Sequence, residues 1–369
     1  MSVGKRRLSK TISILVAVVI TVLSILGLYI QTGYVRYTDA GWGPATTLYS
    51  ASIQLQNTSI VAQLQTDQQT RALAYDPSND MIYVATTEGS EGAIDVISNS
   101  NHSIAAAINF PEGIPSVLVF DDAYNNLYAY DSTHGDNIYV INTSTNKITG
   151  NVSTGINGTI GGAVYDPINR DLYVAGGTAN SLIVVSTITN RVFQSINVGG
   201  NPIFVVYDQT NGYIYVQSGA TGESVRSSTI TIVSPLALIP AISNAIISTL
   251  NFSAEGNGIC YDQDTGDIYA IMNYPAAISE ISSQTNKVMS TIFLPFGFGL
   301  NDASRILYDG PRQLLLVRGN NSLLEFNSSS VSFLKGFELT GLNLVSVNIA
   351  NGYVYASLIS ANEVLELAP

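Results

Sequence analysis

The chain has 369 residues, of which 27 are acidic and 15 are basic, so its formal net charge is −12. This balance excludes DNA or RNA as the main partner, because binding to phosphates requires a cationic surface. One cysteine, Cys260, and two histidines, His102 and His134, exclude a disulfide framework and a thiolate metal cluster, while 46% hydrophobic residues supply a large core.

The N-terminal region predicts a membrane anchor. Residues 1–10 form a basic tail, and residues 11–30 are apolar and uncharged. Twenty residues of helix span about 30 Å, the thickness of a hydrocarbon core. The positive-inside rule then predicts a cytoplasmic tail, a transmembrane signal-anchor at 11–30, a linker at 31–48, and an extracellular domain at 49–369. A cleaved signal peptide is the alternative reading of the apolar segment.

Residues 49–369 contain copies of one pattern. An aromatic residue precedes an Asp in six copies, at Asp76, Asp121, Asp166, Asp208, Asp262 and Asp309. Seven residues after each Asp stand Tyr83, Tyr128, Tyr173, Tyr215, Tyr269 and, in the sixth copy, Leu316. A seventh, degenerate copy has Asn348 at the Asp position and Tyr355 seven residues later. The mean spacing of about 45 residues is typical of one four-stranded propeller blade.

Each copy divides into strand-like segments separated by turn residues. In the third copy these segments are residues 162–166, 172–177, 181–186 and 191–198. The seventh copy supplies only three, at 343–348, 352–358 and 362–369, and residues 60–66 resemble the missing fourth strand. The sequence therefore predicts an all-β fold, a seven-bladed β-propeller with an N-terminal strand closing the last blade, preceded by one transmembrane helix.

The repeats resemble a known family. The segments Tyr83-Val84-Ala85-Thr86 and Tyr173-Val174-Ala175-Gly176, and the units at 138–155 and 183–199, look like the YVTN repeat family of β-propellers. The resemblance covers residues 50–369. It implies the propeller fold and an archaeal cell-surface or surface-layer type of protein, but it implies function only weakly, because propellers host unrelated activities.

The repeated Asp residues are interpreted as structural. Each carboxylate can accept backbone N–H groups in the turn between the first and second strands. A catalytic or metal site would instead lie at the channel mouth, where the inner strands begin. Five residues before each Asp position, that ring consists of Arg71, Ser116, Gly161, Ile203, Asn257, Ser304 and Asn343.

The ring contains no acid, so we expect no catalytic residue, no cofactor and no metal. Loop acids Glu112, Glu255 and Asp302 are oxygen ligands that Ca²⁺ could take, although solvated loop acids are the simpler interpretation. His134 lies near Asp131 and Asp136, with no identifiable nucleophile. The candidate binding residues on the loop face are Arg71, Glu112, His134, Asn257, Phe296, Phe298, Asp302 and Asn343.

Eight N-x-S/T patterns are candidate glycosylation sites: Asn57, Asn101, Asn142, Asn151, Asn157, Asn251, Asn320 and Asn327. Together these features predict a non-enzymatic, membrane-anchored extracellular propeller that binds a cell-envelope protein or glycan in adhesion or surface-layer scaffolding. Two alternatives stay open. One is a lactonase-like or lyase-like enzyme acting at the channel mouth, and the other is an extracellular solute receptor.

Overall fold

The computed structural model describes residues 60–66, 69–131, 136–156, 160–219, 227–235, 244–294, 304–319, 321–338, 342–347, 354–358 and 363–367.

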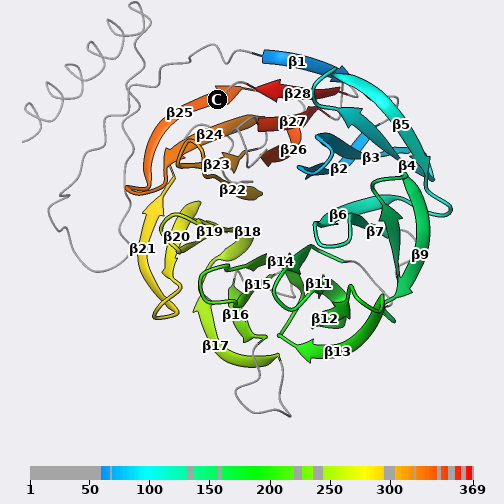
Figure 1. The fold of residues 1–369 in the computed structure, drawn as a ribbon. Helices are drawn as coiled ribbons and strands as arrows, with labels where there is room; N and C mark the ends of the chain where they lie inside the picture. Colours follow the sequence, from blue (N-terminus) through cyan, green and yellow to red (C-terminus); the bar gives the residue numbers. More distant parts are fainter. Residues whose placement is uncertain are drawn as a thin grey trace, which may run out of the picture.

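The described strands form seven four-stranded antiparallel sheets, each called a blade below and arranged in a ring (Figure 1). Six blades use four consecutive strands. Blade one contains β2 (Gln69–Asp76), β3 (Met81–Glu88), β4 (Glu91–Ser98) and β5 (Ser103–Asn109); blade two contains β6 (Pro115–Asp121), β7 (Asn126–Asp131), β8 (Asn137–Asn142) and β9 (Lys147–Ser153). Blade three contains β10 (Ala163–Asp166), β11 (Asp171–Gly176), β12 (Ser181–Ser186) and β13 (Arg191–Asn197), with a short 3₁₀ helix η1 (Gly177–Ala179).

The next three blades repeat this order. Blade four contains β14 (Pro202–Tyr207), β15 (Ile214–Gly219), β16 (Ser228–Ser234) and β17 (Ala245–Phe252); blade five contains β18 (Glu255–Tyr261), β19 (Ile268–Asn273), β20 (Ala277–Ser282) and β21 (Lys287–Phe293). Blade six contains β22 (Arg305–Asp309), β23 (Leu314–Arg318), β24 (Ser322–Asn327) and β25 (Ser332–Glu338). In Figure 1 the first strands lie nearest the centre of the ring and the fourth strands lie at its rim.

Blade seven combines strands from distant parts of the sequence. It contains β26 (Leu342–Val347), β27 (Val354–Leu358), β28 (Glu363–Leu367) and, as its fourth strand, β1 (Ile60–Gln65). β1 pairs with β28 in antiparallel register, with Gln63 opposite Leu365 and Leu64 opposite Val364. This pairing agrees with the sequence-based assignment of residues 60–66 as the strand that closes the ring.

The predicted fold class and localisation both include a transmembrane anchor, and this part of the prediction is wrong. No helix in the described part of the chain is long and apolar enough to cross a membrane. The predicted tail, anchor and linker, residues 1–48, lie outside the described residues. An uncharged apolar segment has the composition of a membrane span, but spanning also requires that its backbone be helical, and composition alone did not establish this.

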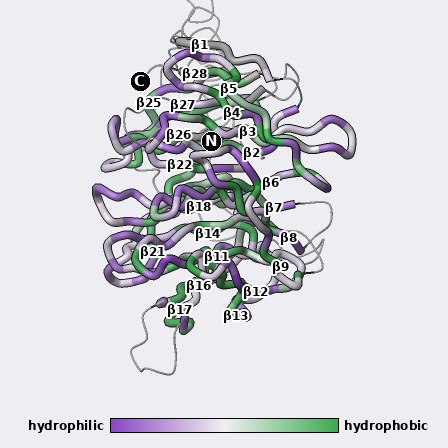
Figure 2. The backbone as a smooth tube through the Cα atoms, turned by 45° about the vertical axis from the view of Figure 1, so that its right-hand side comes forward, coloured by the Kyte–Doolittle hydropathy of each residue, from purple (hydrophilic) through white to green (hydrophobic). Residues whose placement is uncertain are grey.

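The hydrophobic core lies between neighbouring blades. Tyr173 and Val184 of blade three, for example, pack with Tyr207 and Val216 of blade four. Figure 2 shows hydrophobic residues gathered along the strands and hydrophilic residues in many of the connecting turns. Alternate side chains of each sheet thus face the preceding and the following blade, which is why one blade alone could not bury both of its faces.

The inner strands approach one another closely at one glycine. A Cβ atom on Gly161 would lie 2.3 Å from the carbonyl oxygen and 2.4 Å from the Cα atom of Ile203, the adjacent inner segment of blade four. Only a residue without a side chain fits against this backbone.

Gly161→Ala is therefore expected to destabilise the fold by about 1–3 kcal/mol, the usual cost of overpacking. Gly150→Ala is the matched control, because a Cβ atom there meets nothing within 4 Å. Urea unfolding of both variants measures the difference. Equal stability of the two variants would contradict the close approach.

In every blade except blade six, a tyrosine in the second strand ties the blade to the next one. The hydroxyl groups of Tyr83, Tyr128, Tyr173 and Tyr215 donate to the Oδ1 atoms of Asn146, Asn190, Asn244 and Asn286 at 2.9, 2.7, 2.7 and 2.8 Å. Tyr269 donates to the carbonyl oxygen of Ser328 at 3.0 Å, and Tyr355 to Oδ1 of Asn99 at 2.5 Å. Each acceptor lies in the turn between the third and fourth strands of the following blade.

These six tyrosines are almost fully buried. Burial is the main factor that raises the pKa of Tyr83, Tyr128, Tyr173, Tyr215 and Tyr269, so their hydroxyls stay protonated and act as donors. Four of the five asparagine acceptors have positive φ angles of 52–59°, a conformation that asparagine tolerates better than most residues. In these four turns, asparagine thus suits both the backbone conformation of the turn and the hydrogen bond between blades.

Tyr173→Phe is expected to cost about 1–3 kcal/mol, because it leaves the buried Oδ1 of Asn244 without its hydroxyl donor. Tyr213→Phe is the control, since no hydrogen bond of the Tyr213 hydroxyl is present among the described residues. Calorimetric unfolding of both variants tests this prediction, and a loss of the same size in Tyr213→Phe would refute it.

The rim of the ring carries irregular strand pairing. In each of blades one to six a register shift interrupts the pairing of the third and fourth strands. In blade seven the pairing of β1 with β28 shifts between Ile60 and Ala62. Such bulges bend and twist edge strands.

Candidate functional site

The two ends of the blades differ in their chemistry. The turn face carries the turns between first and second strands and between third and fourth strands. The loop face carries the connections between blades and between second and third strands. The N-terminal ends of the inner strands lie at the loop face.

Most of the predicted channel-mouth residues are bulge residues on the inner strands. Register shifts leave Arg71, Ser116, Ile203, Asn257 and Asn343 without a cross-strand partner. Gly161 and Ser304 stand just before β10 and β22, where their N–H groups donate to the carbonyl oxygens of Ala175 and Arg318 at 3.0 and 3.1 Å. The seven positions, five of them bulges, thus place residues of different chemistry at one end of the inner strands.

The structure describes some of the predicted binding residues and not others. Arg71 and Glu112 are exposed, and Asn257 is half-buried. Asn343 is placed on β26 by its backbone. His134, Phe296, Phe298 and Asp302 lie outside the described residues. The structure therefore brings Arg71, Asn257 and Asn343 to equivalent bulge positions in three different blades, and Glu112 to the connection between blades one and two.

The repeated Asp residues form turns, as the sequence indicated. All six are at most 1% exposed. Oδ1 of Asp76, Asp121, Asp166, Asp208 and Asp262 accepts the backbone N–H two residues later at 2.8–3.0 Å, and Asp309 accepts that of Arg312 at 3.4 Å. Their carboxylates are thus held separately in their own turns rather than converging on one ligand.

In blade three a second acid lies opposite the repeated Asp. Asp171 lies directly opposite Asp166 on the paired strands β10 and β11. Burial, followed by the neighbouring charge of Asp166, raises the pKa of Asp171 from 3.8 to about 6. Since the folded state favours the protonated form, Asp171 stabilises the fold below about pH 4, and this contribution is lost as the pH rises through about 6.

Asp171→Asn should therefore raise the thermal midpoint at pH 7.5 and give no gain at pH 4. Asp122→Asn, which removes an exposed acid from the equivalent turn of blade two, controls for the loss of one negative charge. Thermal unfolding at the two pH values provides the measurement. A gain of equal size at both pH values would contradict the raised pKa.

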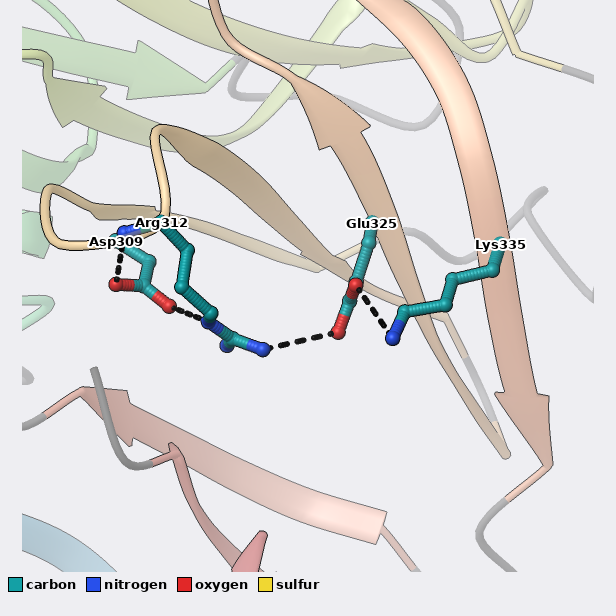
Figure 3. A network of polar contacts seen from close by, with 4 residues as sticks. All are labelled: Asp309, Arg312, Glu325 and Lys335. Atoms are coloured by element: carbon teal, nitrogen blue, oxygen red, sulfur yellow. Dashed lines mark hydrogen bonds and ion pairs between the residues drawn. The ribbon is translucent and has the colours of Figure 1, made fainter. Parts of the chain in front are cut away.

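Blade six departs from the repeat at its turn face. Arg312 bridges Asp309 and Glu325, with its Nη1 atom 3.5 Å from Oε1 of Glu325, and Nζ of Lys335 lies 3.3 Å from Oε2 of the same Glu325 (Figure 3). Asp309 and Glu325 are 0% and 3% exposed. Glu325 is the cross-strand partner of Leu316, the residue that replaces the tyrosine. An ionic network internal to the blade thus accompanies the loss of the tyrosine.

Two further residues at the loop end of blade six were not identified as candidates from the sequence. Arg305 begins β22, Arg318 ends β23, and the two are cross-strand partners. The signal was present in the alignment of the copies: Arg305 stands four residues before the repeated Asp and Arg318 nine residues after it. The alignment does not show that these two positions are neighbours, and only the strand register places them opposite one another.

The candidate glycosylation sites that the structure describes lie in several settings. Asn101 is in the turn between β4 and β5, and Asn142 and Asn327 end β8 and β24, where their Oδ1 atoms accept the N–H groups of Thr145 and Ser330 at 3.1 and 2.9 Å. Asn151 and Asn251 are exposed on rim strands β9 and β17. Asn57, Asn157 and Asn320 lie outside the described residues. Their glycosylation stays a prediction.

The described part of the chain contains no group of three or more His, Cys, Asp or Glu side chains that could hold a metal ion. Cys260 is buried, and burial raises the pKa of its thiol, so it is not an activated nucleophile. One cavity of about 10 Å³ lies between blades two and three, lined by apolar residues such as Val117, Ile138 and Leu172 together with Tyr128 and Tyr130. Its size allows no more than a water-sized occupant.

Comparisons with known proteins support the fold. No family model and no curated protein sequence match the chain. In structure the chain is similar to a chain of hydrazine synthase from Kuenenia stuttgartiensis, with a TM-score of 0.68 and 10% sequence identity; the match covers 83% of this chain and 97% of that one. At this identity the likeness shows the β-propeller fold alone. The resemblance to the YVTN repeat family, with its surface-layer type, is not confirmed.

Proposed function

We propose that the chain is a non-enzymatic binding propeller that contacts a protein or glycan partner through its loop face. The observation that carries this proposal is the series of bulge residues at the start of the inner strands. Their side chains range from the charged Arg71 to the amide Asn257 and the apolar Ile203, whereas the Asp turns at the other face recur in six blades. Variation restricted to one end of a regular scaffold is typical of a binding surface.

The turn face supports the same proposal by contrast. Its recurring polar side chains are engaged within the fold: the Asp carboxylates accept turn N–H groups, and the tyrosine hydroxyls bind the next blade. A partner at this face would compete with hydrogen bonds that hold the blades together. The loop face carries no comparable repeated network among the described residues.

We keep a cell-envelope protein or glycan as the proposed class of partner, with adhesion or surface-layer scaffolding as its use. The alternatives of a lactonase-like or lyase-like enzyme and of a solute receptor have no specific observation in their favour. The described residues contain no group of three or more potential metal ligands to support them.

The test is a pair of charge reversals on opposite faces. Arg71→Glu changes the loop face, and Lys147→Glu changes an exposed residue beside the turn between β8 and β9 on the turn face. The full-length chain is used to recover a partner from its native cells, and the affinity of that purified partner for each variant is then measured. Arg71→Glu is expected to weaken binding by about tenfold, or about 1.4 kcal/mol, and Lys147→Glu to leave it unchanged.

Two results would refute the proposal. One is an equal loss of affinity in both variants, which would show that binding follows net charge rather than the loop face. The other is turnover of the recovered molecule by the wild-type chain, which would indicate the enzyme alternative.

A further inference from the structure

Two arginines lie side by side between blades six and seven at the loop face. Arg305 and Arg318 are directly opposite one another on β22 and β23, and both are half-buried. Cross-strand neighbours on one sheet face have Cβ atoms about 4.5–5.5 Å apart, so the two positive charges share one site.

Both side chains face blade seven. Leu307, two residues after Arg305, and Leu316, two residues before Arg318, pack against the cluster that contains Leu342 and Leu365 of blade seven. Because side chains alternate along a strand, Arg305 and Arg318 share this face with the two leucines. The Nη2 atom of Arg318 donates to the carbonyl oxygen of Leu342 at 3.3 Å, which places its guanidinium group against β26.

Within the described residues the pair has no counter-charge. Among the described residues, no hydrogen bond or ion pair of the Arg305 side chain is present, and the Nε atom of Arg318 is buried without an acceptor. Burial, followed by the charge of Arg318, lowers the pKa of Arg305, and burial also lowers the pKa of Arg318. Like charges directly opposite one another destabilise a sheet, and a buried donor without an acceptor adds to this cost.

The other copies show that the fold does not require charge here. The equivalent cross-strand pairs in the other blades contain small, apolar or neutral polar residues: Ala72 and Ala85, Val117 and Tyr130, Gly162 and Ala175, Phe204 and Gln217, Gly258 and Ile271, and Leu344 and Ser357. In blade four, Gln217 takes the position of Arg318 and ties blade four to blade five, with Nε2 donating to the carbonyl oxygen of Ile271 at 3.3 Å and Oε1 accepting from the N–H of Gly258 at 2.9 Å. A neutral amide therefore suffices as a structural tie.

We propose that Arg305 and Arg318 form an oxyanion-binding site that takes a carboxylate or phosphate group. The guanidinium group presents N–H donors in a planar fork that matches the paired oxygens of either group. A bound oxyanion would supply the missing acceptors and offset the repulsion between the two cations. The site would take such a group from a small molecule and does not require the macromolecular partner proposed above.

The experiment measures the thermal midpoint of the full chain at constant ionic strength, replacing sodium chloride by inorganic phosphate or by succinate. The wild type is expected to gain roughly 2–5 °C in at least one of the two anions, because a ligand that binds only the folded state stabilises it. A gain in phosphate alone identifies a phosphate site, a gain in succinate alone identifies a carboxylate site, and a gain in both identifies a general oxyanion site.

The variants Arg305→Gln and Arg318→Gln are expected to weaken anion affinity, measured by calorimetric titration, by about tenfold or more each. In chloride, Arg305→Gln should keep or raise the wild-type midpoint, since one of two adjacent cations is removed. Arg191→Gln is the control, because it removes an exposed arginine from the fourth strand of blade three, away from the loop face.

Two outcomes would overturn the proposal. In the first, neither anion raises the thermal midpoint of the wild type by more than it raises the midpoint of the Arg305→Gln variant. In the other, Arg305→Gln lowers the midpoint equally in chloride, phosphate and succinate, which indicates a structural role. Arg305→Lys retains the positive charge but lacks the planar guanidinium group. Reduced anion affinity in this variant, with an unchanged thermal midpoint in chloride, would show that the loss comes from the guanidinium geometry and not from a destabilised fold.

Discussion

The antiparallel pairing of β1 with β28 is the contact on which the ring depends. Each blade buries its hydrophobic side chains against two neighbours, so no blade is complete until the last one is closed. The closing pair joins residues about 300 positions apart in the sequence. It has a consequence inside the ring, because blade seven has no turn that connects its third and fourth strands directly.

That missing turn accounts for the irregular sixth copy. In the other blades a second-strand tyrosine reaches the turn between the third and fourth strands of the following blade. Blade six is followed by the one blade without such a turn, and it has Leu316 in place of the tyrosine. The space beside Leu316 is organised by Arg312, Glu325 and Lys335 instead. The joint between blades six and seven is thus polar at its turn end and cationic at its loop end.

The sequence predicted what one copy determines by itself. The strand segments of the third copy, the Asp-centred turns and the closing strand at residues 60–66 all follow from local pattern and period. Contacts between copies could not be predicted in this way. The bond from Tyr173 to Asn244 joins residues 71 positions apart. Within a single copy, the pairing of Arg305 with Arg318 was also missed, because it depends on strand register. The membrane helix was inferred from composition alone, without a repeat or a contact to support it.

The irregular pairing at the rim affects how the molecule meets its neighbours in concentrated solution. The fourth strands expose large apolar side chains, including Phe193, Ile246, Met289, Phe293 and Leu334. On a flat, regular edge such residues would favour addition of a strand from a second molecule, the first step towards ordered aggregates. The register shift in every blade bends and twists the fourth strand, so the rim can present apolar side chains without offering a flat template for sheet growth.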